Sequence, residues 1–386
     1  MGGMTPRERV LATLEHQEPD RVPMDFGNLE TAPMIGAPYG YEALCRFLGI
    51  VDYQQPTIFS LGNVVSNSDE RVLDRLGVDF RSVWPSQPQP EILANGLLRD
   101  AWGIVLKPSG AQIGVPNECC PLRNAKTLKE IDEYPYWPDT HSPLITEGIR
   151  EKAKNYRDRG YAVFASAGYG MMHGHMYAFL RGFDRWLLDM KWDKEFARAL
   201  YEKIGRVAID YSVEFLSAIA DYVDVIELSD DLGMQTQSLM SLEDYREFIK
   251  PHHKKWIAEI ERVAPRAKIF FHSCGAIRQF IPDLIQMGVD ILNPLQPLAA
   301  GMEPEALKRD FGDKLCFHGG IDLQRLLPFG SPEEIRAEVR AVLRTLAPGG
   351  GYILAPANAV PQEVPPQNLL AMYEAGKQHG AYPIEL

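Results

Sequence analysis

The chain has 386 residues, of which 45% are hydrophobic and 24% are charged, so it can bury a large core. Its formal net charge of −12 argues against strongly anionic partners, namely nucleic acids and acidic membrane surfaces. No uncharged apolar stretch approaches the roughly 18 residues of a membrane-spanning helix, and the first residues lack the apolar segment of a secretion signal.

The cysteine content indicates the redox environment. Five cysteines are few, odd in number and scattered along the chain, which does not fit a disulfide framework. Free thiols persist in reducing compartments, so we expect a cytoplasmic protein.

The first predicted element is a helix that begins after Thr5. The segment Thr5-Pro6-Arg7-Glu8 combines a capping residue, a proline at the first helical position and a glutamate three residues after the cap. Val10, Leu11 and Leu14 follow at helical spacing. These features predict an amphipathic helix near the N-terminus.

Short apolar segments rich in β-forming residues recur along the chain, and several end in polar residues or glycine. We predict strands at 22–26, 80–84, 162–167, 222–228, 268–272, 289–292, 314–318 and 351–355. Helical patterns separate most of them, including long stretches at 195–220 and 241–263. Strands that alternate with helices imply a parallel sheet, and about eight repeats favour an α/β fold of the closed (β/α)8, or TIM-barrel, type.

The region from about residue 85 to residue 138 breaks this alternation. It is rich in proline and glycine, and the segment 97–106 followed by Lys107-Pro108-Ser109-Gly110 is typical of a hairpin. We therefore expect an insertion that covers one mouth of the barrel, within a single domain spanning residues 1–386.

The last part of the chain contains a second capping box, Ser331-Pro332-Glu333-Glu334. An apolar stripe follows it, and Pro348-Gly349-Gly350 ends the pattern. The stripe consists of Ile335, Val339, Val342, Leu343 and Leu346.

The tetrapeptide His272-Ser273-Cys274-Gly275 follows the predicted strand at 268–272. Residues i and i+2 of a strand point to the same face, so the imidazole and the thiol would project side by side where sites in parallel barrels are built. Such a pair can bind zinc or act as an acid and a nucleophile. The structural alternative is a half-buried cysteine beside a histidine that bonds a backbone carbonyl. Cys316 and His318 form a second pair, which could complete a four-ligand zinc site.

Polar side chains also follow the other predicted strands, although asparagine and aspartate after a strand are often turn or capping residues. Their coincidence at several strand ends favours a functional site. His173 and His175 fall on the loop after 162–167 and could line the mouth. The other candidates are Asp25, Asn28, Glu227, Asp230, Asp231, Gln235, Asn293, Gln296, His318, Asp322 and Asn358.

Six segments spread over nearly the whole chain resemble the uroporphyrinogen decarboxylase superfamily. They are 4–10, 18–23, 270–275, 319–322, 349–356 and 365–368. The (β/α)8 barrel of that superfamily agrees with the strands predicted above. The resemblance implies one of two activities, because its members are either true decarboxylases or zinc-dependent, corrinoid-linked methyltransferases.

The two branches differ in a segment near the N-terminus. True decarboxylases carry Met-Arg-Gln-Ala-Gly-Arg, whose arginines grip the carboxylates of the tetrapyrrole. The corresponding segment 22–28 reads Val-Pro-Met-Asp-Phe-Gly-Asn, with no arginine after Arg21. Since carboxylate recognition favours bidentate arginine, this difference disfavours the decarboxylase branch.

The methyltransferase branch carries a His-x-Cys pair on a strand, which His272 and Cys274 match. It also carries a third zinc ligand, usually cysteine, in the loop after the last strand, where Asn358 stands here. Asparagine is a poor zinc ligand. Either a carboxylate among Glu227, Asp230 and Asp231 completes the zinc site, or metal binding is weakened or lost.

We therefore expect a zinc-dependent methyltransferase that moves a methyl group between a corrinoid protein and a thiol or other small-molecule acceptor. In this reading His272 and Cys274 hold the metal, and Glu227, Asp231 and His318 are catalytic. The residues expected to bind substrate are Asp25, Asn28, Gln235, Asn293, Gln296, Asp322 and Asn358. One barrel uses up the chain, so the corrinoid would sit on a separate partner protein; a homodimer stays open.

Two alternatives remain. The first is uroporphyrinogen decarboxylation in porphyrin biosynthesis, in which Asp25 or a neighbouring carboxylate would hold the pyrrole N–H groups without a cofactor. The second is a non-catalytic, ligand-binding barrel that has lost its metal together with the ligand at position 358.

Overall fold

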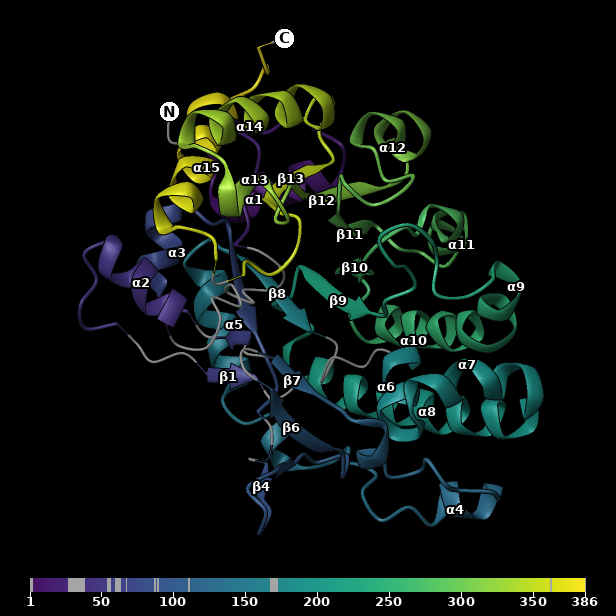
Figure 1. The fold of residues 1–386 in the computed structure, drawn as a ribbon. Coiled ribbons are helices and arrows are strands. Elements are labelled where there is room, and N and C mark those ends of the chain that lie inside the picture. Colours follow the sequence, from purple (N-terminus) through teal and green to yellow (C-terminus); the bar gives the residue numbers. More distant parts are fainter. Residues whose placement is uncertain are drawn as a thin grey trace.

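The computed structural model describes residues 3–26, 39–53, 57–59, 64–66, 68–86, 88, 90–109, 112–166, 173–361 and 363–385. Its centre is a sheet of seven parallel strands, in which strands that follow one another along the chain are neighbours (Figure 1). They are β3 (Phe80–Val83), β8 (Ala162–Ser166), β9 (Val225–Ser229), β10 (Lys268–His272), β11 (Ile291–Leu295), β12 (Cys316–Ile321) and β13 (Tyr352–Pro356). This sequential parallel order is that of a TIM barrel.

The segment 21–26 occupies the eighth position, between the two edge strands of the sheet. The Asp25 N–H donates to the Leu354 carbonyl (3.0 Å), and the Leu354 N–H donates to the Pro23 carbonyl (2.9 Å). On the other side the Asp79 N–H donates to the Met24 carbonyl (2.9 Å), one residue before β3. Pro23 has no N–H, which keeps the ladder short. The chain thus closes the predicted (β/α)8 barrel, with one parallel bridge from Met24 to Leu354 and the hydrogen bonds above in place of a full strand at 22–26.

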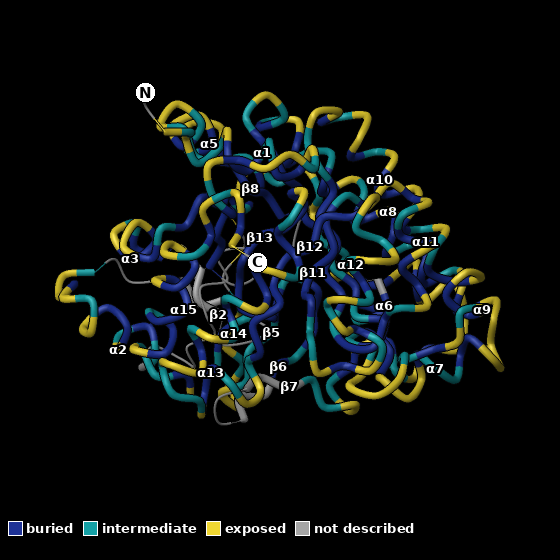
Figure 2. Tube along the Cα trace, turned by 90° about the horizontal axis from the view of Figure 1, so that it is seen from above, coloured by how far each residue is buried: buried dark blue, intermediate teal, exposed yellow. Residues whose placement is uncertain are grey.

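Helices form the outer layer, and Figure 2 shows buried strands inside a ring of helices with exposed outer faces. The helices are α1 (Pro6–Leu14), α2 (Tyr39–Phe47), α3 (Glu70–Leu76), α4 (Leu128–Asp132), α5 (Ile149–Asp158), α6 (His173–Arg181), α7 (Phe183–Trp192), α8 (Lys194–Ile219), α9 (Leu242–Asp244), α10 (Lys250–Val263), α11 (Ile281–Gln286), α12 (Pro304–Phe311), α13 (Leu326–Phe329), α14 (Pro332–Leu346) and α15 (Pro366–His379). A π-helical turn, Tyr245–Ile249, joins α9 to α10 within the stretch predicted as one helix.

Both predicted capping boxes are confirmed. The Thr5 hydroxyl accepts the Glu8 N–H (3.2 Å), and the Glu8 carboxylate accepts the Thr5 N–H (2.8 Å). Ser331 and Glu334 repeat this exchange at the start of α14. Each cap stabilises its helix by about 1 kcal/mol. The predicted apolar stripe of α14 is buried, as expected for a helix packed on a barrel.

The predicted insertion contains a four-stranded antiparallel sheet in place of the single expected hairpin. The expected hairpin corresponds to β5 (Leu98–Arg99) and β6 (Val105–Ser109), and β4 (Glu91–Ile92) and β7 (Gln112–Gly114) add a strand on each side. Strands of two or three residues carry almost no alternating pattern, which explains why the sequence did not reveal them. The sheet lies at the lower end of the molecule in Figure 1. A separate hairpin joins β1 (Thr57–Phe59) and β2 (Val64–Ser66).

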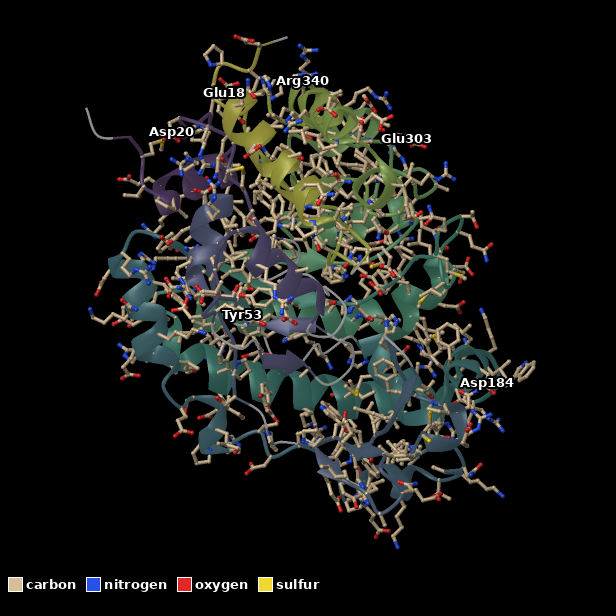
Figure 3. The ribbon with its side chains drawn as sticks, turned by 60° about the vertical axis from the view of Figure 1, so that its left-hand side comes forward. Glu18, Asp20, Tyr53, Asp184, Glu303 and Arg340 are labelled. Atoms are coloured by element: carbon tan, nitrogen blue, oxygen red, sulfur yellow. The ribbon has the colours of Figure 1, made fainter. Side chains whose placement is uncertain are left out.

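The charged residues Glu18, Asp20 and Arg340, labelled in Figure 3, lie toward the end of the molecule that carries both termini. Among the described residues, no helix combines the length and the apolar character needed to cross a membrane.

Inside the barrel, aromatic rings meet edge to face from strand to strand, with centroids 6.0 Å apart for Phe80 and Phe164 and 5.0 Å apart for Phe164 and Phe270. These rings fill the interior beneath the strand ends that carry the candidate site.

Candidate metal centre

Three side chains of different chemistry meet at the carboxyl ends of β9 and β10. Asp231, His272 and Cys274 each offer one ligand atom, and these atoms all lie within 4.8 Å of one another. His272 Nε2 lies 3.4 Å from Cys274 Sγ and 3.6 Å from Asp231 Oδ1. The parallel register explains the meeting, because His272 pairs with Ser229 and the residues just beyond both strands therefore lie side by side.

The backbone fixes the spacing of these donors. Asp231 Oδ1 accepts the N–H of Cys274 (2.8 Å), and the Met234 carbonyl accepts the N–H of Ala276 (2.8 Å). A Cβ atom at Gly275, whose φ is +83°, would lie 2.6 Å from the carbonyl carbon of Gly233. A Cβ at Gly233 would meet the Ala276 nitrogen at 2.7 Å. Only glycine fits at both positions, so the loops after β9 and β10 are held against each other.

A chain of hydrogen bonds runs behind His272. His272 Nδ1 lies 2.6 Å from Asn293 Oδ1, Asn293 Nδ2 lies 2.7 Å from His318 Nδ1, and His318 Nε2 lies 2.9 Å from Asp25 Oδ2. All four side chains are buried. Nδ1 of His272 is thereby hydrogen-bonded on the side away from the other two potential ligands, and Nε2 faces Asp231 and Cys274.

Asn358 stands beside the donors, on the loop that follows β13. Its side-chain N–H donates to Cys274 Sγ at 3.0 Å, and its Oδ1 accepts the N–H of Ala359 at 2.7 Å. The side chain therefore contacts the sulfur as a hydrogen-bond donor, and its oxygen is used within its own loop. In this arrangement Asp231 is the carboxylate close enough to serve as a third ligand.

The electrostatics of this group follow from burial. Burial raises the pKa of the Cys274 thiol well above its usual value, and the charge of Asp231 raises it further, while the Asn358 hydrogen bond lowers it. Burial likewise lowers the pKa of His272, against the opposing effect of Asp231. A divalent cation between these groups would favour the thiolate and the imidazole lone pair.

Asp230 points away from the three donors although it precedes Asp231. Its carboxylate accepts the Gly174 N–H at the start of α6 (3.1 Å) and lies 3.0 Å from His253 Nε2. His175, expected on a loop, lies in α6 with its two ring nitrogens 4.0 Å from Asp230 and Asp231. Burial lowers the pKa of His175, but the two carboxylates outweigh it and the net shift is upward. The side chain of His173 lies outside the described residues.

Glu227 faces the barrel interior from β9, where it pairs in register with Ser166 and Phe270. Burial raises the pKa of Glu227 to about 8, against the opposing effect of a hydrogen bond with Ser166. The carboxyl group is therefore mostly protonated at pH 7 and can donate a hydrogen bond.

Three further candidates, Gln235, Gln296 and Asp322, do not join the three ligand residues. Asn28 lies outside the described residues. Gln296 accepts the Gly275 N–H (2.7 Å), which supports the loop that carries Cys274. Gln235 donates to the Leu298 carbonyl and accepts from Gln324. Asp322 accepts three backbone N–H groups, those of residues 324–326, and so has the capping role that is common for aspartate after a strand.

The suggested four-ligand site with Cys316 is wrong. Cys316 Sγ lies 3.8 Å from the carbonyl oxygens of Thr13 and Leu14, so it packs against α1. His318 bonds Asn293 and Asp25 instead. Cys316 begins β12 and His318 lies in mid-strand, so the thiol is too far back from the strand ends to share their site.

The fold and this geometry define a class: a (β/α)8 barrel with nitrogen, oxygen and sulfur donors at the carboxyl ends of its strands. Residues 116–379 match the family described as uroporphyrinogen decarboxylase (URO-D). The chain belongs to this family, as its resemblance indicated.

Relatives of both branches are found. A uroporphyrinogen decarboxylase from Chlorobium phaeovibrioides is 26% identical over 194 residues (49% of this chain, 51% of that protein), and one from Chlorobaculum tepidum is 23% identical over 271 residues (68% and 71%). A methylated-thiol–coenzyme M methyltransferase from Methanosarcina mazei is 26% identical over 248 residues (63% and 61%). The chain thus spans about half the length of the first of these relatives.

The fold is shared with a solved structure, a methyltransferase from Methanosarcina mazei. The two superimpose with a TM-score of 0.62 at 17% identity, and the match covers 97% of this chain and 99% of the other. This agreement extends over the whole barrel and confirms the predicted fold class.

Proposed function

We propose that this protein is a zinc-dependent methyltransferase of the URO-D family, which moves a methyl group between a corrinoid protein and a small thiol or similar acceptor. The observation that carries the proposal is the grouping of Asp231, His272 and Cys274 with their ligand atoms within 4.8 Å. The methyltransferase relative supports the reaction class, because its name specifies a methylated thiol as substrate.

The donors suit zinc. Thiolate and imidazole are preferred zinc ligands, carboxylate is an accepted third, and three protein ligands leave a position for substrate. His272 offers Nε2 while its other ring nitrogen is bonded by Asn293, an arrangement typical of metal-binding histidines. Bound zinc would lower the pKa of a thiol or hydroxyl acceptor and so make a nucleophile available at neutral pH.

The chain's own residues would hold and orient the reactants. Asp231 and Asn358 flank Cys274, and they set the charge and the hydrogen bonding of its sulfur. Glu227 lies deeper in the barrel as a protonated carboxyl group, where it can donate a hydrogen bond or a proton to bound substrate. We retain Glu227 and Asp231 as catalytic candidates.

The decarboxylase alternative is weakened by the position of Arg21. Its guanidinium group bonds Asp79 (2.9 and 3.0 Å), which precedes β3 and therefore lies at the amino end of the barrel, away from the strand ends that carry the candidate site. Asp25, Glu227, Asp230 and Asp231 lie toward the carboxyl end. A tetrapyrrole with many carboxylates would meet acidic groups there and no clamp from Arg21.

Metal analysis of protein purified without chelator tests the proposal. We expect about one zinc per chain in the wild type. Cys274→Ala should lose the zinc. It should also lose methyl transfer from methylcobalamin to a small thiol, which is measured from the change in cobalamin absorbance. Cys119→Ala, at a partly exposed cysteine outside the centre, is the matched control and should retain both.

Two outcomes would contradict the proposal. Stoichiometric zinc in Cys274→Ala would show that the metal binds elsewhere. Release of carbon dioxide from uroporphyrinogen by the purified protein would instead establish the decarboxylase reaction.

A further inference from the structure

We propose that Asn293 and His318, anchored by Asp25, are positioning residues that hold His272 in the tautomer whose Nε2 lone pair faces Asp231 and Cys274. The inference rests on the proposed metal centre and deepens it. It gives a role to three side chains whose sequence pattern pointed to substrate binding or catalysis.

The geometry of these side chains forms an unbroken path. They come from β10, β11, β12 and the segment 21–26, and each successive contact is 2.6 to 2.9 Å long. His318 and Asn293 are fully buried and Asp25 is 1% exposed, so this path is shielded from water. Such burial suits holding His272 from behind rather than meeting a substrate in the mouth.

The direction of every hydrogen bond follows from the carboxylate at the end of the path. A carboxyl oxygen accepts hydrogen bonds, so the His318 Nε2 that lies 2.9 Å from Asp25 Oδ2 carries the proton of that contact. With the ring proton on Nε2, His318 Nδ1 accepts, so the end of the Asn293 amide that faces it is the N–H donor. The amide oxygen of Asn293 consequently faces His272 and accepts from its Nδ1–H. A neutral His272 is left with its lone pair on Nε2, the atom that faces the donors.

The surroundings keep these groups in place. The Tyr373 hydroxyl donates to the Asp25 carbonyl (2.7 Å), and the Phe270 ring contacts His318 edge to face at 5.1 Å between centroids. The Asn293 carbonyl accepts the Ser273 N–H (2.7 Å), which joins the Asn293 backbone to the residue after His272. Asp25 Oδ1 has no hydrogen-bond partner within the part of the chain that the structure describes. The Asp25 side chain is therefore held through its other oxygen, Oδ2, which contacts His318.

A purely structural role would be served better by other residues. A buried polar network has to be desolvated, and apolar side chains of similar volume often stabilise a core as well or better. What the network adds is a fixed tautomer, because the proton position on one ring nitrogen is set by the hydrogen bond that the other makes. Removal of Asn293 would release the proton of His272 to either nitrogen.

Nitrogen-15 NMR of the metal-free protein tests the tautomer directly. The chain has nine histidines, so His272→Gln assigns the signals of His272 in protein labelled at histidine. In the wild type we expect a protonated Nδ1 and an unprotonated Nε2. In Asn293→Leu we expect the Nε2–H form to be populated. A wild-type His272 protonated at Nε2, or signals unchanged by Asn293→Leu, would overturn the inference.

Zinc affinity, measured by competition with a chromophoric chelator, is the second readout. Asn293→Leu should bind zinc about 10- to 100-fold more weakly. His318→Phe, which keeps an aromatic ring against Phe270, should weaken binding less but in the same direction. Asn293→Asp preserves the acceptor for His272 Nδ1 but removes the N–H donor to His318, so it should recover part of the affinity that Asn293→Leu loses.

Asn368→Leu is the matched control for this substitution. Asn368 is 3% exposed and donates to the carbonyls of Leu327 and Gly330, away from the metal centre. It should lose stability without loss of zinc affinity. Equal affinities in the wild type and Asn293→Leu would overturn the positioning role. A wild type that binds no zinc would defeat the proposed function, and the NMR result would still decide the tautomer.

Discussion

Buried carboxyl groups have different partners at the two ends of the barrel. At the amino end, Asp79 is bonded by both Arg9 (2.5 Å) and Arg21 (2.9 Å). Asp224, just before β9, is paired with Arg7 (3.0 Å) and Arg157 (3.2 Å). Each buried negative charge there has two guanidinium groups of its own chain.

At the carboxyl end, no lysine or arginine among the described residues forms an ion pair with Asp25, Glu227, Asp230 or Asp231. Their contacts among the described residues include imidazoles, a hydroxyl, a thiol and backbone N–H groups. Within the part of the chain that the structure describes, the three aspartates therefore face histidines, and none of the four carboxyl groups has a lysine or arginine as an ion-pair partner.

This difference indicates that the two ends of the barrel have different roles. In TIM barrels the amino end serves stability and the carboxyl end carries chemistry. Here the amino end is complete without a ligand, whereas the carboxyl end has donors and charge that suit a divalent cation. The following changes test this division, from the largest expected effect to the smallest.

Asp79→Asn should produce the largest loss of stability. It leaves Arg9 and Arg21 partly buried beside a neutral side chain, and breaking such a pair costs about 3–5 kcal/mol of unfolding free energy. Urea denaturation measures the loss. Asp313→Asn, at an exposed ion pair with Lys314, is the control and should change stability by less than about 0.5 kcal/mol. A weakened zinc affinity in Asp79→Asn would contradict the division between the two ends.

Glu227→Gln should increase stability at neutral pH. The folded-state pKa of Glu227 is about 8, above the ordinary value of 4.5, so the folded state binds the extra proton and the wild type loses stability as pH rises between these values. At pH 7 the difference is about 3 kcal/mol. Denaturation between pH 5 and pH 9 measures it. Parallel curves for wild type and variant would show that Glu227 ionises freely.

Asp231→Asn should weaken zinc binding without destabilising the fold. It removes a charged ligand but keeps an oxygen that can accept the Cys274 N–H. Zinc affinity should fall roughly 100-fold, or about 2.7 kcal/mol, with the unfolding free energy of the metal-free protein little changed. Unchanged zinc affinity would exclude Asp231 as a ligand.

Asn358→Ala should have the smallest effect. It removes the N–H···S hydrogen bond to Cys274, which is worth about 1 kcal/mol, so zinc affinity should fall about fivefold. Chelator competition is again the measurement. Asn358→Cys places a thiol in the same position and should bind zinc more tightly than the wild type; weaker binding would mean that this loop cannot present a ligand.

The sequence was informative where one residue type has one structural meaning. Apolar runs located most strands, the Thr5 and Ser331 boxes located two helix starts, and the His272–Cys274 spacing brought two donors together. It failed where tertiary contacts override local preference. Pro294 and Gly319 lie inside β11 and β12, although the predicted strands end at 292 and 318.

The direction of the polar side chains could not be predicted either. Asn293 and His318 follow apolar runs just as Asp231 does. Yet Asn293 and His318 point into a buried path, whereas Asp231 faces His272 and Cys274. That distinction depends on the register between strands and on the depth of each residue in its strand, which spacing in one sequence does not contain.

The contact between Gly233 and Gly275 has a consequence for how the protein would acquire its ion. Because these two loops interlock through their backbones, we expect Asp231 and Cys274 to keep their separation whether or not an ion is bound. Loading would then be a reversible equilibrium of a folded chain, unlike the coupled folding of small zinc modules. A chelator would strip the centre and leave the barrel intact, ready to be refilled.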